Sequence, residues 1–483
     1  MFILPNFFST DIGKTLPENI TDKQFLELEI RRWKYSLERK MQIDGERYYN
    51  GDHDVLHRKR TVIGEGGTLQ EVQNLPNNRI VDNQFSKLVN QKVSYLLAKP
   101  ITFETGNNAD DDALSSVFNQ GFLNKLKSGG IDALCGGLFW LYVYYNERGE
   151  LSFQRFKPYE ILPFWKDSDH TELDCAVRLY EVEGYEGIYP RIYEKVEVFT
   201  KEGILRFDLV NGALVEDIDH PHGYYAYVGD KGFTWEQIPL IAFKANAQEI
   251  PLIKRVKSLQ DALNLMHSDL LNNMQEDNRN TLLVIKNFDG QDLGEFRRNL
   301  SVYGAVKVRS GDGADGGVET LGIEVNAQNY DLVLKTLKKS IIENGAGYDA
   351  KDDRLGGNAN MLNIKSMYSD IDLDADSMEA EFKASFEKLM FFVNSYLNKD
   401  LDPKITFNRD TLINETEVID NLVKLGVKLP NELLVSQVPF VNDVGEVMDM
   451  LKKEQEENDV YAQVFNAPNG EQVNDAETGI LAE

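Results

Sequence analysis

Residues 251–277, PLIKRVKSLQDALNLMHSDLLNNMQED, decide the fold. Their large apolar side chains recur three or four positions apart, which is the spacing of one face of an α-helix. These side chains are Leu252, Val256, Leu259, Leu263, Met266, Leu270 and Met274. The polar residues between them, such as Asn264, Ser268 and Asn272, mostly face elsewhere. A helix of this length spans roughly 40 Å, which is long for a globular domain.

A second helix with the same spacing is predicted downstream, starting near residue 330. Its apolar positions are Tyr330, Val333, Leu334, Leu337 and Ile341. The stretch between the two helices, 281–325, changes to short runs with β character. These runs cover 282–285, 305–308 and 321–325, with a short helix at 293–300 and a glycine-rich tip at 310–317. The sequence therefore places a small α/β insert between two long helices.

The rest of the chain predicts helices around a β-rich segment. Helical periodicity, and breaks at Asn-Gly, Gly-Gly and Pro, give helices at 21–49, 77–97, 111–129 and about 374–398. Alternating apolar residues with intervening turns predict successive strands over 138–243. Residues 345–360 form a glycine-rich loop that is expected to be mobile, 410–455 hold two or three short helices, and the last twenty or so residues are expected to be disordered. The predicted class is a multidomain α+β fold.

Composition narrows the possible functions. The chain has 483 residues, a formal net charge of −27 and two cysteines, Cys135 and Cys175. This charge argues against a protein that grips DNA through an excess of Lys and Arg. Two cysteines without a CxxC pair exclude a disulfide scaffold and a cysteine-based zinc site. The longest uncharged run, 133–146, is too short to span a membrane, and no convincing export signal precedes it.

Motifs for catalysis are weak. The glycines at 64–67 lack the Lys-Ser/Thr of a phosphate-binding loop. The run Asp370, Asp372, Asp374 and Asp376 resembles a calcium loop but has Ala375 where glycine is needed. These aspartates equally suit the start of a helix, where they would cap it. A metal-dependent hydrolase that uses this cluster remains an alternative.

Three segments together resemble one protein family. Tyr48-Tyr-Asn-Gly-Asp-His53-Asp-Val-Leu56 is similar to the YY-x-G-x-H-x-I signature of portal proteins from tailed bacteriophages. The stretches 76–101 and 153–163 resemble the same family, in the form typical of long-tailed phages and prophages of Gram-positive bacteria. The order of elements extends the likeness over roughly residues 25–455.

The resemblance implies a mainly helical portal fold with named parts. Portals of this kind are rings of twelve subunits around a DNA channel at one capsid vertex. By resemblance, the parts are a wing at 1–250, stem helices at 251–277 and 327–344, a clip at 278–326, a tunnel loop at 345–362, a further long wing helix at 363–399, a crown at 400–455 and a disordered tail at 456–483.

The resemblance also implies a mechanical rather than an enzymatic function, with no cofactor. Double-stranded DNA would pass without sequence recognition, and the partners would be the terminase large subunit, a head–tail adaptor, and the major capsid and scaffolding proteins. The protein would assemble in the host cytoplasm and end in the virion. A few cations would steady the duplex, and the candidates are Lys351 and Arg354 in the loop, then Lys335, Lys338 and Lys339. An acidic capsid or adaptor component without a DNA channel is the other alternative.

Overall fold

The computed structural model describes residues 22–63, 68–71, 75–228, 231–276, 281–286, 317–322, 327–349 and 361–409, with a few positions between 430 and 453. The chain divides into two compact units, Met1–Asp349 with Tyr368–Asp410, and Ala350–Met367 with Thr411–Glu483. The account below concerns the first unit, which contains nearly all of the described residues.

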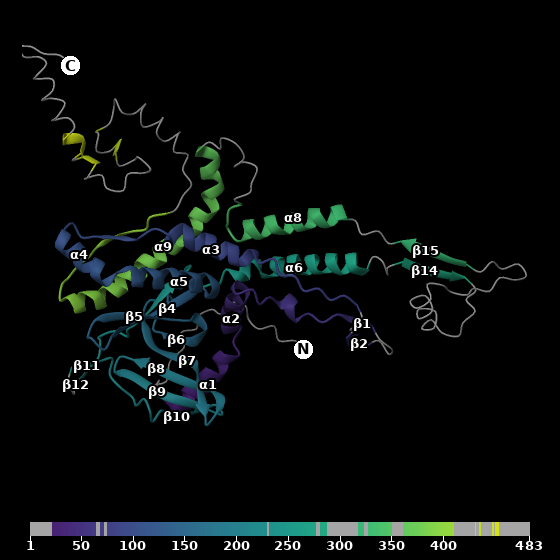
Figure 1. Ribbon diagram of the computed structural model, residues 1–483. Helices are drawn as coiled ribbons and strands as arrows, with labels where there is room; N and C mark the ends of the chain where they lie inside the picture. The colour runs from purple at the N-terminus through teal and green to yellow at the C-terminus, as the bar shows by residue number, and fades with distance from the viewer. Residues whose placement is uncertain are drawn as a thin grey trace, which may run out of the picture. The chain divides into compact units, whose positions relative to one another are not determined.

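The described part of the first unit combines helices and antiparallel sheets, which confirms the α+β prediction (Figure 1). The helices are α1 (Lys23–Lys34), α2 (Leu37–Tyr49), α3 (Gln84–Leu97), α4 (Asn108–Val117), α5 (Gln120–Gly136), α6 (Ile253–Glu276), α8 (Ala327–Asn344) and α9 (Met361–Leu397), with 3₁₀ turns at Asp54–His57 and Pro158–Glu160. The strands are β1 (Thr61–Ile63), β2 (Leu69–Glu71), β3 (Thr102–Glu104), β4 (Leu138–Tyr145), β5 (Leu151–Phe156), β6 (Ile161–Trp165), β7 (Leu173–Glu186), β8 (Tyr189–Thr200), β9 (Gly203–Val210), β10 (Ala213–Glu216), β11 (Ala226–Val228), β12 (Lys231–Phe233), β13 (Leu240–Lys244), β14 (Thr281–Lys286), β15 (Gly317–Gly322) and β16 (Lys404–Thr406).

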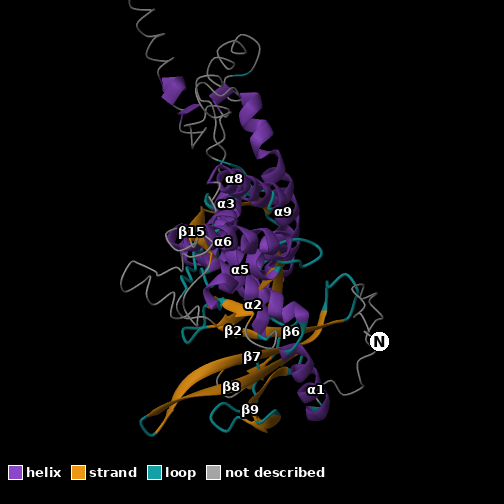
Figure 2. Cartoon of the chain, turned by 90° about the vertical axis from the view of Figure 1, so that its right-hand side faces the viewer, coloured by secondary structure: helices purple, strands orange, loops and turns teal. Residues whose placement is uncertain are grey.

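A five-stranded antiparallel sheet, in the order β10-β9-β8-β7-β6, packs against other elements on both faces. Helix α1 lies against one of these faces (Figure 2). On β7, Cys175, Val177 and Leu179 pack in one apolar cluster with Leu26 and other side chains of α1. The alternate residue Ala176 packs in a second cluster with side chains of the three-stranded sheet β13-β4-β5. Successive side chains of a strand point to opposite faces, so these strands are apolar on both sides. The strands predicted over 138–243 are confirmed.

The second half of α9 supplies much of the aromatic core. Phe382 and Phe386 are fully buried. Phe382 lies against Phe139 of β4 and Phe243 of β13, and Phe386 lies against Phe243. The Ser385 hydroxyl also donates to the Ala242 carbonyl at 2.8 Å, between two buried elements. This contact fixes the register of α9 against the sheet.

Two of the predicted helices are each divided into two helices in the structure. The helix expected over 21–49 is broken at Tyr35–Ser36, where the Ser36 hydroxyl accepts from the Arg39 amide and caps α2. The helix expected over 111–129 is two helices, and α5 continues through Gly129–Gly130. A Cβ atom at Gly129 would lie 2.5 Å from the Phe139 ring, so this glycine permits close packing and does not end the helix.

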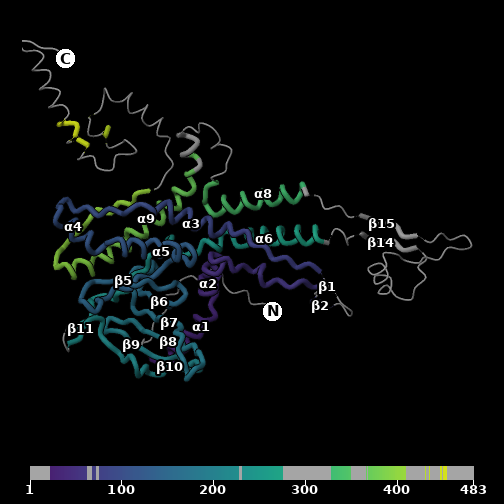
Figure 3. Tube along the Cα trace, in the orientation of Figure 1, coloured from purple at the N-terminus to yellow at the C-terminus, as the bar shows by residue number. Residues whose placement is uncertain are grey.

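Helices α6 and α8 lie side by side (Figure 3). The Asn273 amide of α6 donates to the Tyr330 hydroxyl of α8 at 3.0 Å. Both predicted helices are confirmed, and the second has the bounds that the family resemblance implied. Between them in the chain, β14 and β15 pair from Thr281↔Gly322 to Lys286↔Gly317. β15 begins at the end of the predicted tip and ends inside the predicted run 321–325, and the expected elements at 293–300 and 305–308 lie outside the described residues.

Candidate functional site

The signature segment Tyr48–Leu56 turns the chain from α2 toward α6. Gly51 has φ +90°, a conformation that side-chain-bearing residues rarely adopt. The His53 amide donates to the Gly51 carbonyl at 3.1 Å, which closes the turn. The 3₁₀ turn Asp54–His57 follows at once. The motif therefore encodes a compact reversal that presents Tyr48 and Asp54 to the first half of α6.

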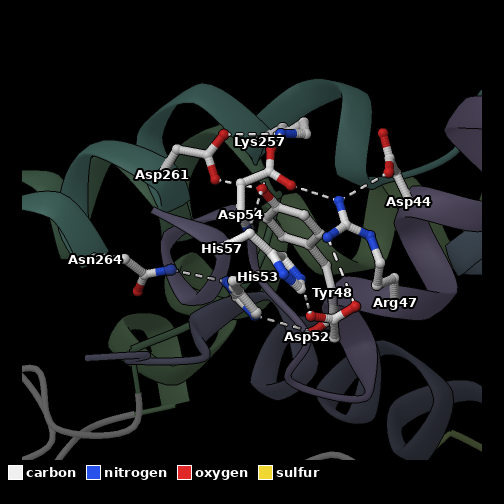
Figure 4. A network of polar contacts seen from close by, with 10 residues as sticks. All are labelled: Asp44, Arg47, Tyr48, Asp52, His53, Asp54, His57, Lys257, Asp261 and Asn264. Carbon is white, nitrogen blue, oxygen red and sulfur yellow. Dashed lines mark hydrogen bonds and ion pairs between the residues drawn. The ribbon is translucent and has the colours of Figure 1, made fainter. Parts of the chain in front are cut away.

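Lys257 of α6 is the centre of a charged network, which we call the Lys257 latch (Figure 4). Its Nζ lies 2.8 Å from the Tyr48 hydroxyl, 2.5 Å from Asp54 Oδ2 and 2.9 Å from Asp261 Oδ2. The Tyr48 hydroxyl donates to Asp261 Oδ1 at 2.5 Å. Arg47 reaches Asp54 from the other side, also at 2.5 Å. The latch joins α2 and the signature turn to α6.

The electrostatics of the Lys257 latch favour a fixed role. Burial and the hydrogen bond to Asp261 raise the pKa of Tyr48, so the phenol stays protonated and donates. Burial opposes ionisation of Asp54, but hydrogen bonds from Lys257 and Arg47 hold its pKa below the usual range. Burial opposes the charge of Lys257 too, but its partners raise its pKa. These pKa values move away from neutrality, whereas a general acid or base needs a value near the working pH.

His53 is fully buried between the signature turn and α6. The Asn264 side-chain amide lies 2.8 Å from His53 Nδ1, and His53 Nε2 lies 3.0 Å from the Tyr48 carbonyl. Asn264 Oδ1 accepts from the Asp82 amide, so its NH₂ group faces His53, and the ring is neutral with the proton on Nε2. Burial lowers the pKa of His53, which agrees with this neutral state.

Four buried polar side chains, one every fourth residue along α6, bind a neighbouring extended segment. We call them the α6 polar ladder: Gln260, Asn264, Ser268 and Asn272. Their oxygens accept from the backbone amides of Gln84, Asp82, Ile80 and Asn78, in that order, at 2.7 to 3.0 Å. Two residues of extended chain advance about 6.6 Å and four residues of helix about 6 Å, so the two periods match.

This ladder corrects two sequence predictions. The helix expected from residue 77 begins only at Gln84, because the amides of Asn78, Ile80 and Asp82 bind α6 and do not enter a helical turn. The polar residues of α6 were expected on faces away from the packed stripe, but the four ladder residues are at most 2% exposed. The apolar stripe itself ends exposed at Met274. The repeat of amide and hydroxyl residues at every fourth position was the sequence signal that could have indicated a buried polar face.

The predicted channel cations do not converge on one site in the described part of the chain. On α8, Lys335 pairs with Asp331 at 2.7 Å and Lys339 approaches Glu343 at 3.7 Å, both on their own helix. Lys338 instead binds Asp82 at 2.8 Å and so ties α8 to the extended segment. Lys351 and Arg354 lie outside the described residues.

The aspartate cluster is neither a loop nor a helix cap. Asp370, Asp372, Asp374 and Asp376 lie inside α9, which begins at Met361 and not near 374. In a helix their side chains spread around the axis and do not converge as in a calcium loop. Their partners are protein cations: Arg409 binds Asp372 at 3.1 Å and also Asp376, and Lys92 binds Asp374 at 2.7 Å. No group of three or more His, Cys, Asp or Glu side chains in the described ranges is placed to hold a metal ion.

Lys92 of α3 links the end of α8 to α9. It is 5% exposed, and its Nζ donates to the Ala346 carbonyl at 2.9 Å as well as to Asp374. Burial lowers its pKa, although Asp374 opposes this. No local pattern in the sequence indicates this contact, since the residues are more than 250 positions apart.

Comparison with known proteins identifies the family. A family model described as phage portal protein, SPP1 Gp6-like, matches residues 33–461. The chain belongs to this phage portal family. The resemblance predicted from the signature turn is thereby confirmed, and the Lys257 latch and the polar ladder lie within the portal match. None of the described helices is long and apolar enough to cross a membrane.

Two curated portal proteins are similar to this portal chain over most of their length. The portal protein of Bacillus phage SPP1 is 26% identical over 436 residues, which cover 85% of this chain and 83% of that protein. The portal protein of Clostridium phage phiCD119 is 27% identical over 430 residues, which cover 85% of this chain and 92% of that protein.

Proposed function

We propose that the chain forms a dodecameric ring at one vertex of a phage capsid, and that double-stranded DNA is packaged and ejected through the ring. The observation that carries this proposal is the portal-family match over residues 33–461. In this function the protein is mechanical, because a separate ATP-driven terminase moves the DNA. Head–tail adaptors later take the place of the terminase on the ring. The major capsid and scaffolding proteins hold the ring in the shell.

The described elements can be assigned to the parts of a portal subunit. We assign α6 and α8 to the stem, β14 and β15 to the clip at 278–326, residues 345–362 to the tunnel loop and 400–455 to the crown. The wing is then 1–250 together with α9. Two paired helices of roughly 36 and 27 Å flank the clip strands in the chain, as is needed to hold a small insert away from the main body.

The latch and the ladder explain how one stem helix is held in the body. Lys257 and the four ladder residues attach α6 to α2 and to the extended segment over most of its length. A helix fixed on one face by buried hydrogen bonds resists sliding, because each broken bond leaves a buried polar group without a partner. In the proposed ring, this attachment would transmit force between wing and stem.

The channel would carry few cations. An overall charge of −27 disfavours tight DNA binding, which suits a duplex that must slide. We propose Lys351 and Arg354 as the first candidates for DNA contact. Lys335 and Lys339 follow, because their side chains are largely exposed and their ion pairs with their own helix are weak. Lys338 is a poorer candidate, because it also binds Asp82.

Negative-stain electron microscopy of the purified protein, with light scattering on the same sample, tests the ring. Rings with an axial hole and a mass many times 55.0 kDa are expected. A solid assembly without a hole would favour the acidic capsid component that encloses no DNA. Portals can require a scaffold to assemble, so a monomer is tested again with the scaffolding protein present, and a monomer there contradicts the proposal.

The loop cations are tested by replacing Lys351 and Arg354 together with alanine. The expected result is altered DNA packaging or retention in assembled particles. The matched control replaces Lys127 and Arg148, which are exposed on α5 and on the β4–β5 turn. Equal packaging and retention in the two double variants would remove the loop pair from the proposed contacts.

A further inference from the structure

A small cavity lies between the end of β6, the start of β7, β13 and the second half of α9. Its volume is about 60 Å³, and its apolar wall includes Leu173, Leu240 and Phe392. A single water needs roughly 10–15 Å³ of such space, so a group of several atoms can enter. Part of the lining is exposed, at Glu172 and Lys201, so the cavity borders solvent on that side.

Trp165, the last residue of β6, brings a hydrogen-bond donor without an acceptor to this cavity. Its indole N–H is buried and has no acceptor among the described residues. The ring is held on both sides, because its centroid lies 5.7 Å from that of Trp140 and 5.0 Å from that of His170. A buried N–H that gives up water without gaining an acceptor costs free energy. The orphaned indole therefore indicates that something else accepts from it.

Lys388 of α9 brings an unbalanced positive charge to the same cavity. Its side chain is half-buried, its Nζ donates to the Thr171 carbonyl at 2.7 Å, and it forms no ion pair in the described part of the chain. Burial lowers the pKa of Lys388, and the nearby charge of Lys244 adds to this effect. Attraction from Asp167 and Glu381 does not offset the two effects. An anion beside Lys388 would stabilise its charged form.

The other charged groups around the cavity are already paired with each other. Glu172 is the single carboxylate among the described residues of the lining, and its Oε1 lies 2.5 Å from Lys166 Nζ and 3.6 Å from Lys201 Nζ. Glu249, which lies nearby outside the lining, binds Lys244 at 2.9 Å. The side chain of Lys201 is half exposed, so it can reach a ligand as well. The lining therefore holds two lysines and one carboxylate, and that carboxylate is shared between two cations.

We propose that this cavity, which we call the Trp165 pocket, is a binding site for a small oxyanion. A carboxylate or phosphate group has several acceptor oxygens, so one group can accept from the Trp165 N–H and from the ammonium groups of Lys388 and Lys201. Water could accept from the indole, but it would leave the charge of Lys388 unbalanced. The same chemistry is carried by a free anion such as phosphate and by a carboxylate of a polypeptide. The proposal is independent of the portal function.

The test measures binding of sodium phosphate and of sodium acetate to the full-length chain by isothermal titration calorimetry. The ionic strength is fixed at about 0.15 M with sodium chloride, so that screening is the same throughout. Lys388→Met removes the charge but keeps an unbranched side chain, and Trp165→Phe removes the N–H but keeps an aromatic ring. Lys383→Met is the matched control, because Lys383 is also on α9 but is paired with Glu379 at 2.8 Å and does not line the cavity.

The expected result is saturable binding of at least one of the two anions by the parent. The affinity should fall about 10-fold or more in Lys388→Met, where a hydrogen bond to a charged group is lost, and about 5-fold in Trp165→Phe, where a neutral one is lost. Lys383→Met should stay within about 2-fold of the parent, because an exposed lysine contributes little at a distance. Tighter binding of phosphate would assign the site to a free anion, and tighter binding of acetate to a carboxylate.

Two results would overturn the proposal. If the parent binds neither anion in a saturable way, the cavity is a water-filled space and not an anion site. If the parent, Lys388→Met and Trp165→Phe bind with equal affinity, the anion binds elsewhere on the chain. The two variants remove different donors, so either one that still unfolds cooperatively is sufficient for the comparison.

Discussion

Replacing Gln260 with methionine should destabilise the contact between α6 and α3. Gln260 is fully buried, and its Oε1 accepts from the amides of Gln84 and Phe85 at 3.0 and 3.1 Å. Its Nε2 donates to the Asp82 carbonyl at 2.7 Å. Gln84 and Phe85 open α3, whose first amides have no acceptor within the helix. Gln260 therefore completes the N-terminal cap of a different helix.

The structure sets the size of the effect. Methionine has a similar volume and helix propensity, so neither a cavity nor a poorer helix is expected. The Gln84 amide keeps the Asp82 carbonyl at 2.9 Å, whereas the Phe85 amide loses the acceptor that Gln260 gives it. An orphaned buried amide costs about 1–3 kcal/mol and each further hydrogen bond about 1 kcal/mol. We expect a loss of about 2–4 kcal/mol, or roughly 30- to 700-fold in the local opening equilibrium.

Hydrogen exchange and urea unfolding measure this loss at fixed protein concentration. Faster exchange should appear in peptides that cover residues 80–90, together with a lower unfolding midpoint. The matched control is Gln328→Met, which makes the same change at an exposed position of α8 and should stay within about 0.5 kcal/mol. A loss below about 0.5 kcal/mol in Gln260→Met, or unchanged exchange in 80–90, would refute the capping role.

Three further predictions concern other buried contacts. Burial lowers the pKa of His53 below its unfolded value near 6.5, so the unfolded chain binds more protons than the folded one. Stability should therefore fall as pH drops below about 6.5, by at most about 1.4 kcal/mol per pH unit. His53→Gln should flatten this slope in urea titrations between about pH 7 and 5, and an unchanged slope would assign the protons to other groups. Lys92→Met should cost about 1–3 kcal/mol in thermal unfolding, since the remaining carboxylate of Asp374 is partly exposed; a variant as stable as the parent contradicts this. Gly129→Ala should cost about 1–3 kcal/mol by calorimetry, because its Cβ would press on Phe139, and a neutral or stabilising result would mean that the ring moves freely.

Periodicity predicted the elements whose apolar residues recur regularly. Helix α8 and the strands over 138–243 follow from local spacing, because a buried face imposes its own period on the sequence. The bounds of α3 and α5 did not follow, because in each case a distant residue changes the local outcome. Phe139 fills the space that a side chain at Gly129 would take, and side chains of α6 accept from the amides of Asn78, Ile80 and Asp82.

The sequence by itself determined the family, through the signature turn Tyr48–Leu56, and the pair of long helices, through a repeat visible within one window. Only the tertiary structure decided what α6 packs against. Its amide and hydroxyl residues look solvent-facing in isolation, since polarity alone predicts exposure. They are buried because an extended segment almost two hundred residues earlier has unpaired backbone amides at a matching period. The match between the acceptors of α6 and the amides of the extended segment depends on both segments, so the sequence of either one alone does not reveal it.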